Sequence, residues 1–160
     1  MKFLIVVIIP VILLQGCGNV ELKKHNNYGS EKISAYLKYS PEEVKILPLT
    51  EVTELYGRPE IEAYIGLLDK HSNYMKSPAI FRFELYHYRE RSADSKGSRI
   101  KKWDDIKLIN PAENNKYWND YLRAYKFDLK LDSAQEDTYI LQVTCNCPNG
   151  KRLTAKKQIN

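Results

Sequence analysis

The chain has 160 residues, 43% of them hydrophobic, and carries a formal net charge of +5. This length suffices for one domain with a core of its own. Its seven glycines are scattered and form no phosphate-binding loop, and the sequence holds neither a G-x-S-x-G nor an H-E-x-x-H motif. These absences argue against a nucleotide-binding loop, a serine hydrolase of that type and a zinc protease.

The first residues are typical of a secretory signal. Lys2 supplies a positive charge, and residues 3–14 form an apolar run interrupted only by Pro10. A run of about a dozen residues is too short to span a membrane, which takes roughly 20. We therefore expect the chain to be exported, which argues against a nucleic-acid partner despite the positive charge.

The apolar run ends in Leu14-Gln15-Gly16-Cys17, which resembles the bacterial lipobox. The resemblance implies cleavage between Gly16 and Cys17, a lipid on the Cys17 thiol and acylation of the new amino group. Two or more acyl chains anchor a protein stably to a membrane. Gly18 follows the cysteine, at the position where aspartate would favour retention in the inner membrane. The resemblance therefore implies the outer membrane, and we expect the protein at its periplasmic face.

Cleavage leaves 160 − 16 = 144 residues with a formal charge of +4, because Lys2 leaves with the signal. Residues 17–40 are polar and are predicted to form a flexible tether. Residues 41–160 are predicted to form one folded domain.

From residue 41 onward the sequence pattern predicts β-structure, because apolar and polar residues alternate as they do on half-buried strands. Phe81, Phe83 and Leu85, for example, share one face of a long segment. The predicted strands span residues 44–50, 61–68, 79–91, 103–109, 121–131, 138–147 and 152–159. Pro148-Asn149-Gly150 predicts the turn of a terminal hairpin.

A short helix is predicted to begin at Asn110, because a helix-capping side chain, a proline and an acidic residue follow one another in residues 110–113. Such a helix would cross between two sheets. About seven strands without alternating helices favour an all-β fold, an antiparallel β-sandwich of immunoglobulin-like or transthyretin-like topology.

No residues stand out as catalytic. Asp104 and Asp105 are adjacent and would face opposite ways on a strand. His87 lies near the end of a predicted strand. We therefore expect a protein without enzymatic activity, without a cofactor and without a metal site.

Cys145 and Cys147 are the cysteines that remain once Cys17 carries lipid. At positions i and i+2 of one strand they point the same way, roughly 6.5 Å apart at Cα, which is near the outer limit for a disulfide. Three interpretations stay open: two reduced thiols, a strained and easily reduced disulfide, or half of a metal site completed by residues such as His71 and His87. A thiol-redox or metal protein is thus a less favoured alternative function.

Twelve tyrosines and two tryptophans are present. Trp103, Trp118, Tyr121 and Arg123 lie in or beside the least regular part of the chain. Aromatic residues and arginine are common at protein interfaces, and loops often carry function on rigid scaffolds. We expect these four residues to form a partner-binding surface.

Two family resemblances involve the predicted domain. The residues that carry the first are Phe81-Arg82-Phe83-Glu84-Leu85-Tyr86, Lys96-Gly97, Trp103, Tyr117-Trp118, Leu122-Arg123-Ala124-Tyr125, Val143-Thr144-Cys145 and Pro148-Asn149-Gly150-Lys151-Arg152-Leu153. They resemble uncharacterised β-sandwich lipoproteins of planctomycete-like bacteria, which implies a fold and a location but no activity. Phe83-Glu84-Leu85-Tyr86 and the loop after it are similar to the small outer-membrane lipoprotein of type VI secretion systems.

The sequence therefore predicts a lipid-anchored envelope lipoprotein whose non-catalytic β-sandwich binds a partner protein or ligand. The second resemblance implies an alternative, an assembly subunit of an envelope or secretion machine.

Overall fold

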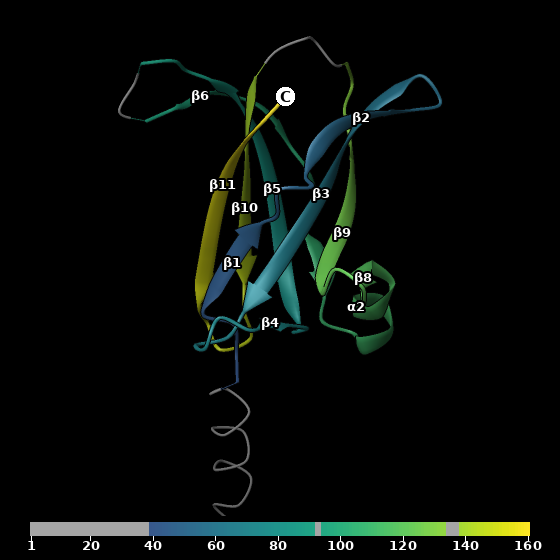
Figure 1. Cartoon of the computed structure of the whole chain (residues 1–160), viewed down its shortest axis with the longest axis vertical. Coiled ribbons are helices and arrows are strands. Elements are labelled where there is room, and N and C mark those ends of the chain that lie inside the picture. Colours follow the sequence, from purple (N-terminus) through teal and green to yellow (C-terminus); the bar gives the residue numbers. More distant parts are fainter. Residues whose placement is uncertain (1–38, 92–93, 134–137) are drawn as a thin grey trace, which may run out of the picture.

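A computed structural model describes residues 39–91, 94–133 and 138–160 of the chain. The predicted signal peptide, the Gly16–Cys17 cleavage site, the lipid attachment at Cys17 and almost all of the predicted tether lie outside these residues. Within them, two antiparallel sheets face each other and one short helix lies at one side (Figure 1). The predicted all-β sandwich is confirmed.

The first sheet is organised around its longest strand, β3 (Arg58–Leu68). Strands β1 (Glu43–Ile46) and β2 (Glu51–Leu55) pair with successive halves of one edge of β3. Strands β9 (Ala124–Lys130) and β4 (Tyr74–Met75) pair with its other edge, and β8 (Trp118–Asn119) extends the sheet beyond β9.

The second sheet has the order β11-β10-β5-β6. Its central strands are β10 (Tyr139–Asn146) and β5 (Ala79–Tyr88), and β11 (Arg152–Ile159) closes the predicted terminal hairpin. Strands β6 (Lys96–Lys102) and β7 (Ile106–Leu108) pair with opposite halves of β5. Gly150, in the predicted turn, has a φ of 82°, a conformation that glycine adopts without steric cost.

The core is formed by the apolar faces that the alternation predicts. Phe81, Phe83 and Leu85 of β5 are almost wholly buried, and Phe127 of β9 lies against both phenylalanines with ring centroids 5.0 and 4.8 Å away. The matching buried faces are Ile61, Ala63, Ile65 and Leu67 on β3, Tyr125, Phe127 and Leu129 on β9, and Leu141, Val143 and Cys145 on β10. Burying one such large side chain contributes about 1.5–3 kcal/mol, so this core holds the sheets together.

The helix α2 (Pro111–Tyr117) confirms the helix predicted from residue 110. The side chain of Asn110 accepts hydrogen bonds from the backbone N–H groups of Ala112 and Glu113, as an N-cap does. The helix leads from β7 in the second sheet to β8 in the first, so it makes the predicted crossover.

Several strand boundaries differ from prediction. Residues 44–50 do not form one strand, because β1 ends at Ile46 and β2 begins only at Glu51. Of residues 103–109 only the three of β7 are strand, and the strand expected from residue 121 begins at Ala124. Strand β6 was not predicted, because its residues are mostly charged and exposed.

Candidate functional site

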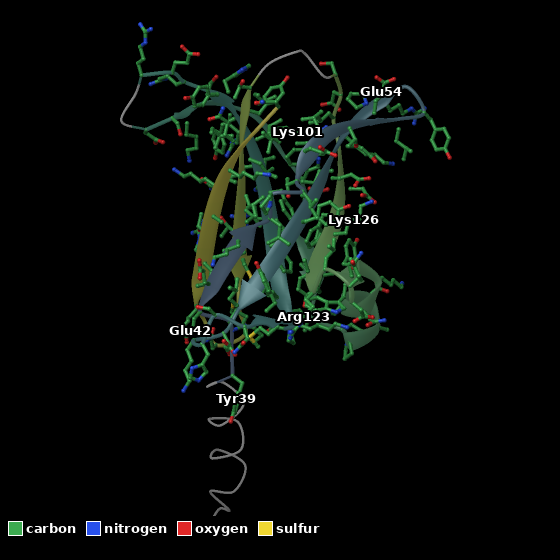
Figure 2. All side chains as sticks on the ribbon, viewed as in Figure 1. Tyr39, Glu42, Glu54, Lys101, Arg123 and Lys126 are labelled. Atoms are coloured by element: carbon green, nitrogen blue, oxygen red, sulfur yellow. The ribbon has the colours of Figure 1, made fainter. Side chains whose placement is uncertain are left out.

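The structure keeps Trp118, Tyr121 and Arg123 of the predicted partner-binding surface together, at β8 and the turn into β9, and places Trp103 apart from them. The Trp103 indole N–H donates to the backbone carbonyl of Lys130, at the last residue of β9. Trp118 pairs with Tyr125 near the first residue of that strand. Five residues of strand span about 16 Å, so the two tryptophans lie near opposite ends of β9. Figure 2 shows Arg123 toward one end of the sandwich and Lys101 toward the other. Lys101 marks the position of Trp103, because its Nζ lies 5.9 Å from the centroid of the Trp103 ring.

Trp118 and Arg123 make contacts within the domain. The Trp118 ring packs edge-on against Tyr125 with centroids 5.0 Å apart, and its indole N–H donates to Asp120. The Arg123 guanidinium donates to the backbone carbonyl of Tyr74. Tyr121 has 95% of its surface exposed, so it is the member of the predicted set most accessible to a partner.

Cys145 and Cys147 lie side by side at the end of β10. Both are buried free thiols, and their sulfur atoms are 3.8 Å apart, joined by a hydrogen bond. This separation is a contact between two thiols and is longer than the S–S bond of a disulfide, about 2.05 Å. His87 is exposed on β5, the strand that pairs with β10, but it lies opposite Tyr139, at the other end of the register from the cysteines.

The two thiols differ in acidity because they share a hydrogen bond and are buried to different extents. Hydrogen bonding to Cys147, and then burial, raise the pKa of Cys145. Its hydrogen bond with Cys145 and the nearby charge of Lys151 lower the pKa of Cys147. Cys147 is therefore the thiol that ionises first, although it is 6% exposed.

A groove runs between the two sheets where each sheet ends in an edge strand. It has a volume of about 610 Å³ and is lined by β1 and its flanking residues (42–48), residues 152–156 of β11 and Tyr74. We call this the edge groove. Among the described strands, β1 and β11 each pair on one side only, and they lie next to each other in Figure 1.

Lys157 fixes one end of the edge groove. Its ammonium group donates to the backbone carbonyls of Leu47, Pro48 and Thr50, at 3.1, 2.7 and 2.8 Å. Partial burial lowers the pKa of Lys157. We call these three hydrogen bonds the Lys157 clamp. They tie the β1–β2 connection of the first sheet to β11 of the second.

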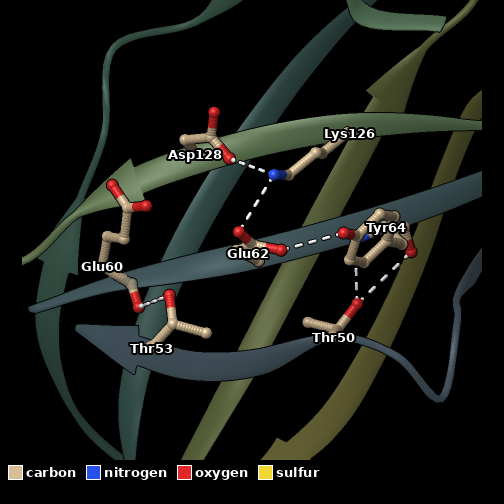
Figure 3. A network of polar contacts seen from close by, with 7 residues as sticks. All are labelled: Thr50, Thr53, Glu60, Glu62, Tyr64, Lys126 and Asp128. Atoms are coloured by element: carbon tan, nitrogen blue, oxygen red, sulfur yellow. Dashed lines mark hydrogen bonds and ion pairs between the residues drawn. The ribbon is translucent and has the colours of Figure 1, made fainter. Parts of the chain in front are cut away.

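A network of charged residues lies on the outer face of the first sheet (Figure 3). The Lys126 ammonium lies 3.0 Å from Oε1 of Glu62 and 3.4 Å from Oδ1 of Asp128. The Tyr64 hydroxyl donates to the other oxygen of Glu62 at 2.8 Å. The hydrogen bonds from Lys126 and Tyr64 lower the pKa of Glu62. The hydrogen bond to Glu62 raises the pKa of Lys126.

Glu60 lies on the same outer face of the first sheet but takes no part in these contacts. It is 7% exposed, and its carboxylate comes within 4.8 Å of those of Glu62 and Asp128. We call Glu60, Glu62 and Asp128 the acidic cluster. Sequence analysis did not find it, although the two-residue spacing of Glu60 and Glu62 on a strand signals a shared face.

The chain matches no protein-family model, no curated protein and no solved structure. Over residues 39–91, 94–133 and 138–160, no helix is both long and apolar enough to cross a membrane.

Proposed function

We propose that this chain is an envelope lipoprotein, anchored to the periplasmic face of the outer membrane by lipid on Cys17, and that its sandwich is a non-catalytic domain that binds a partner protein. The lipobox-like Leu14-Gln15-Gly16-Cys17 supports the anchor. The edge groove is the observation that supports partner binding.

Edge strands present backbone N–H and C=O groups that no neighbouring strand satisfies, and such edges pair readily with an extended chain. In this domain two edges, β1 and β11, border the same groove, so a single extended segment placed there can contact both sheets. The Lys157 clamp holds the β1–β2 connection beside β11, which keeps one end of the groove in place before a partner arrives. The partner we propose is therefore an extended segment of another envelope protein.

Photo-cross-linking of the full chain in its native membrane tests this proposal. A cross-linking residue replaces Thr154 on β11 or Lys45 on β1, one on each side of the edge groove. The control position is Glu113, exposed on helix α2. An adduct of one mass at both groove positions and none at Glu113 supports the proposal. Adducts absent from the groove positions, or equally strong at Glu113, overturn it.

The anchor has its own test, the intact mass of the protein extracted from membranes. The mass of residues 17–160 plus a lipid adduct is the expected result. An unlipidated mass, or retention of residues 1–16, overturns the proposed location.

A further inference from the structure

We propose that the outer face of the second sheet docks on the anionic phospholipid headgroups of the membrane beside it, a proposal that rests on the proposed envelope location. This face consists of the outward side chains of β11, β10, β5, β6 and β7 (Figure 1). Phe81, Phe83 and Leu85 of β5 point into the core, so the residues between them point outward. We call this surface the basic face, because its strands carry seven basic residues and one acidic residue, Glu84.

More than half of these basic residues have no carboxylate to balance them. Three are held in ion pairs, which join Arg82 to Asp105, Arg99 to Glu84 and Lys156 to Asp94. Within residues 39–91, 94–133 and 138–160, no ion pair involves the other four, which are Lys96, Lys102, Lys107 and Arg152. The basic face therefore has an excess of four positive charges.

The outer face of the first sheet lacks this excess. Five acidic residues on its strands, the acidic cluster among them, slightly outnumber four basic residues. Several of these charges neutralise one another, as Lys126 does with Glu62. The positive charge of the strands is thus concentrated on one side of the sandwich, and that side attracts an anionic partner.

The four unpaired cations are spread too widely to hold one small anion. Lys107 lies opposite Ile80 at one end of β5, and Lys96 lies opposite Tyr88 at the other end. Eight residues of strand span about 26 Å. Arg152 lies three strands away from Lys107, about 14 Å across the sheet. Cations at these distances contact an extended anionic surface and not a single phosphate or carboxylate.

The proposed anchor favours a membrane over an acidic protein as this surface. Tyr39, where the described residues begin, follows Cys17 by 22 residues. That length of chain spans at most about 75 Å, so it does not prevent the basic face from reaching the bilayer that holds the lipid. An attached domain meets its own membrane at high effective concentration. Each lysine or arginine near an anionic lipid surface strengthens binding about fivefold.

Vesicle flotation tests the basic face without the lipid anchor. The protein is residues 17–160 with Cys17→Ser, which holds every described residue and therefore both sheets. At low salt we expect it to float with vesicles of equal parts phosphatidylcholine and phosphatidylglycerol but not with pure phosphatidylcholine, and high salt should release it. Lys102→Glu with Lys107→Glu should weaken binding at least about tenfold. Lys45→Glu with Lys130→Glu is the matched control, because it makes the same charge change on the outer face of the first sheet.

Lysine acetylation of the same protein gives a second measurement that needs no substitution on the basic face. Bound phosphatidylglycerol vesicles should slow the acetylation of Lys102 and Lys107 and leave that of Lys45 and Lys130 unchanged, as read by peptide mass mapping. Equal binding to both kinds of vesicle, an equal loss in the control variant, or equal slowing on both faces overturns the proposal. Slowing at Lys102 and Lys107 only in native membranes that keep their proteins also overturns it, and indicates an acidic protein on this face instead.

These outcomes are separate from those that test the anchor and the edge groove. The flotation assay uses a chain without lipid, so it can fail while the protein extracted from membranes still carries a lipid adduct, and it can succeed when that adduct is absent. Lys102 and Lys107 do not line the edge groove, so their substitution leaves the cross-linking positions Thr154 and Lys45 in place.

Discussion

The hydroxyl of Tyr125 lies 3.0 Å from Oδ1 of Asn114 inside the domain, where it joins the first sheet to helix α2. The same hydroxyl accepts a hydrogen bond from the backbone N–H of Ser77, which precedes β5 of the second sheet. Asn114 in turn donates to the carbonyls of Ser77 and Leu108. One buried tyrosine thus links both sheets and the helix that crosses between them.

Replacing Tyr125 with phenylalanine removes this hydroxyl and keeps the ring. The backbone N–H of Ser77 and the Asn114 side chain then lose a partner in a buried setting, which costs about 1–3 kcal/mol. We expect the free energy of unfolding, measured with denaturant, to fall by that amount. Tyr121→Phe is the control, because Tyr121 is 95% exposed, and it should change stability by less than about 0.5 kcal/mol. Equal effects of the two variants would contradict this role of Tyr125.

Trp118 tests whether an aromatic ring of the predicted surface supports the fold. Full removal of a buried aromatic ring costs about 3–5 kcal/mol, and the half-buried Trp118 packs on Tyr125, so Trp118→Ala should cost about 2–3 kcal/mol. Tyr121→Ala should leave the free energy of unfolding unchanged. Thermal or denaturant unfolding of both variants checks the difference. A Trp118→Ala protein as stable as the wild type would return Trp118 to the set of residues available to a partner.

Lys157→Met removes the ammonium that clamps the β1–β2 connection. Three backbone carbonyls then lose a charged donor, although water can reach some of them, so we expect a loss of about 1–2 kcal/mol. Hydrogen exchange should show faster exchange in residues 47–52 than in the wild type. Lys156→Met is the neighbouring control, because Lys156 is exposed and its ammonium lies 3.7 Å from Asp94 in an ion pair. The same acceleration in both variants would contradict the clamp.

The core could be predicted from the sequence because strand alternation assigns each residue to a face. Phe81 and Phe83, for instance, are buried as that pattern requires. The pattern does not say which strands are neighbours. The pairing of β3 with β9, which brings Asp128 to Glu62, joins residues 60 to 70 positions apart and leaves no local signal.

Closeness in sequence predicted closeness in space for only part of the predicted partner surface, because Trp103 lies apart from Trp118, Tyr121 and Arg123. Trp103 precedes β7 of the second sheet, whereas Trp118 lies in β8 of the first. Helix α2 carries the chain from one sheet to the other between them. The edge groove could not be predicted for a related reason, since it depends on which strands end each sheet.

The cysteine pair gives a prediction about reactivity. We expect the purified protein, kept without reductant, to show no loss of two mass units, because Cys145 and Cys147 are hydrogen-bonded thiols. Alkylation of the folded protein should be slow and should begin at Cys147, whose pKa is lowered while that of Cys145 is raised. Peptide mass mapping after iodoacetamide treatment identifies the site. Cys147→Ser should leave Cys145 unreactive until the protein is unfolded. In the wild-type protein, a mass two units lower would instead show a disulfide.

The ion pair between Arg82 and Asp105 predicts how stability depends on pH. Both Asp105 oxygens accept from the guanidinium at 2.8 Å, which lowers the pKa of Asp105 below its usual value. Because the folded pKa lies below the unfolded value of about 3.9, the pair contributes stability above about pH 4 and loses it as the pH falls through the folded pKa. Asp105→Asn should therefore be less stable than the wild type at neutral pH, and the difference should shrink below about pH 4. Denaturant unfolding across pH 2–7 measures this, with Asp104→Asn, at an exposed neighbour, as the control. A difference between wild type and Asp105→Asn that stays constant down to the lowest pH would show that the ion pair does not stabilise the fold.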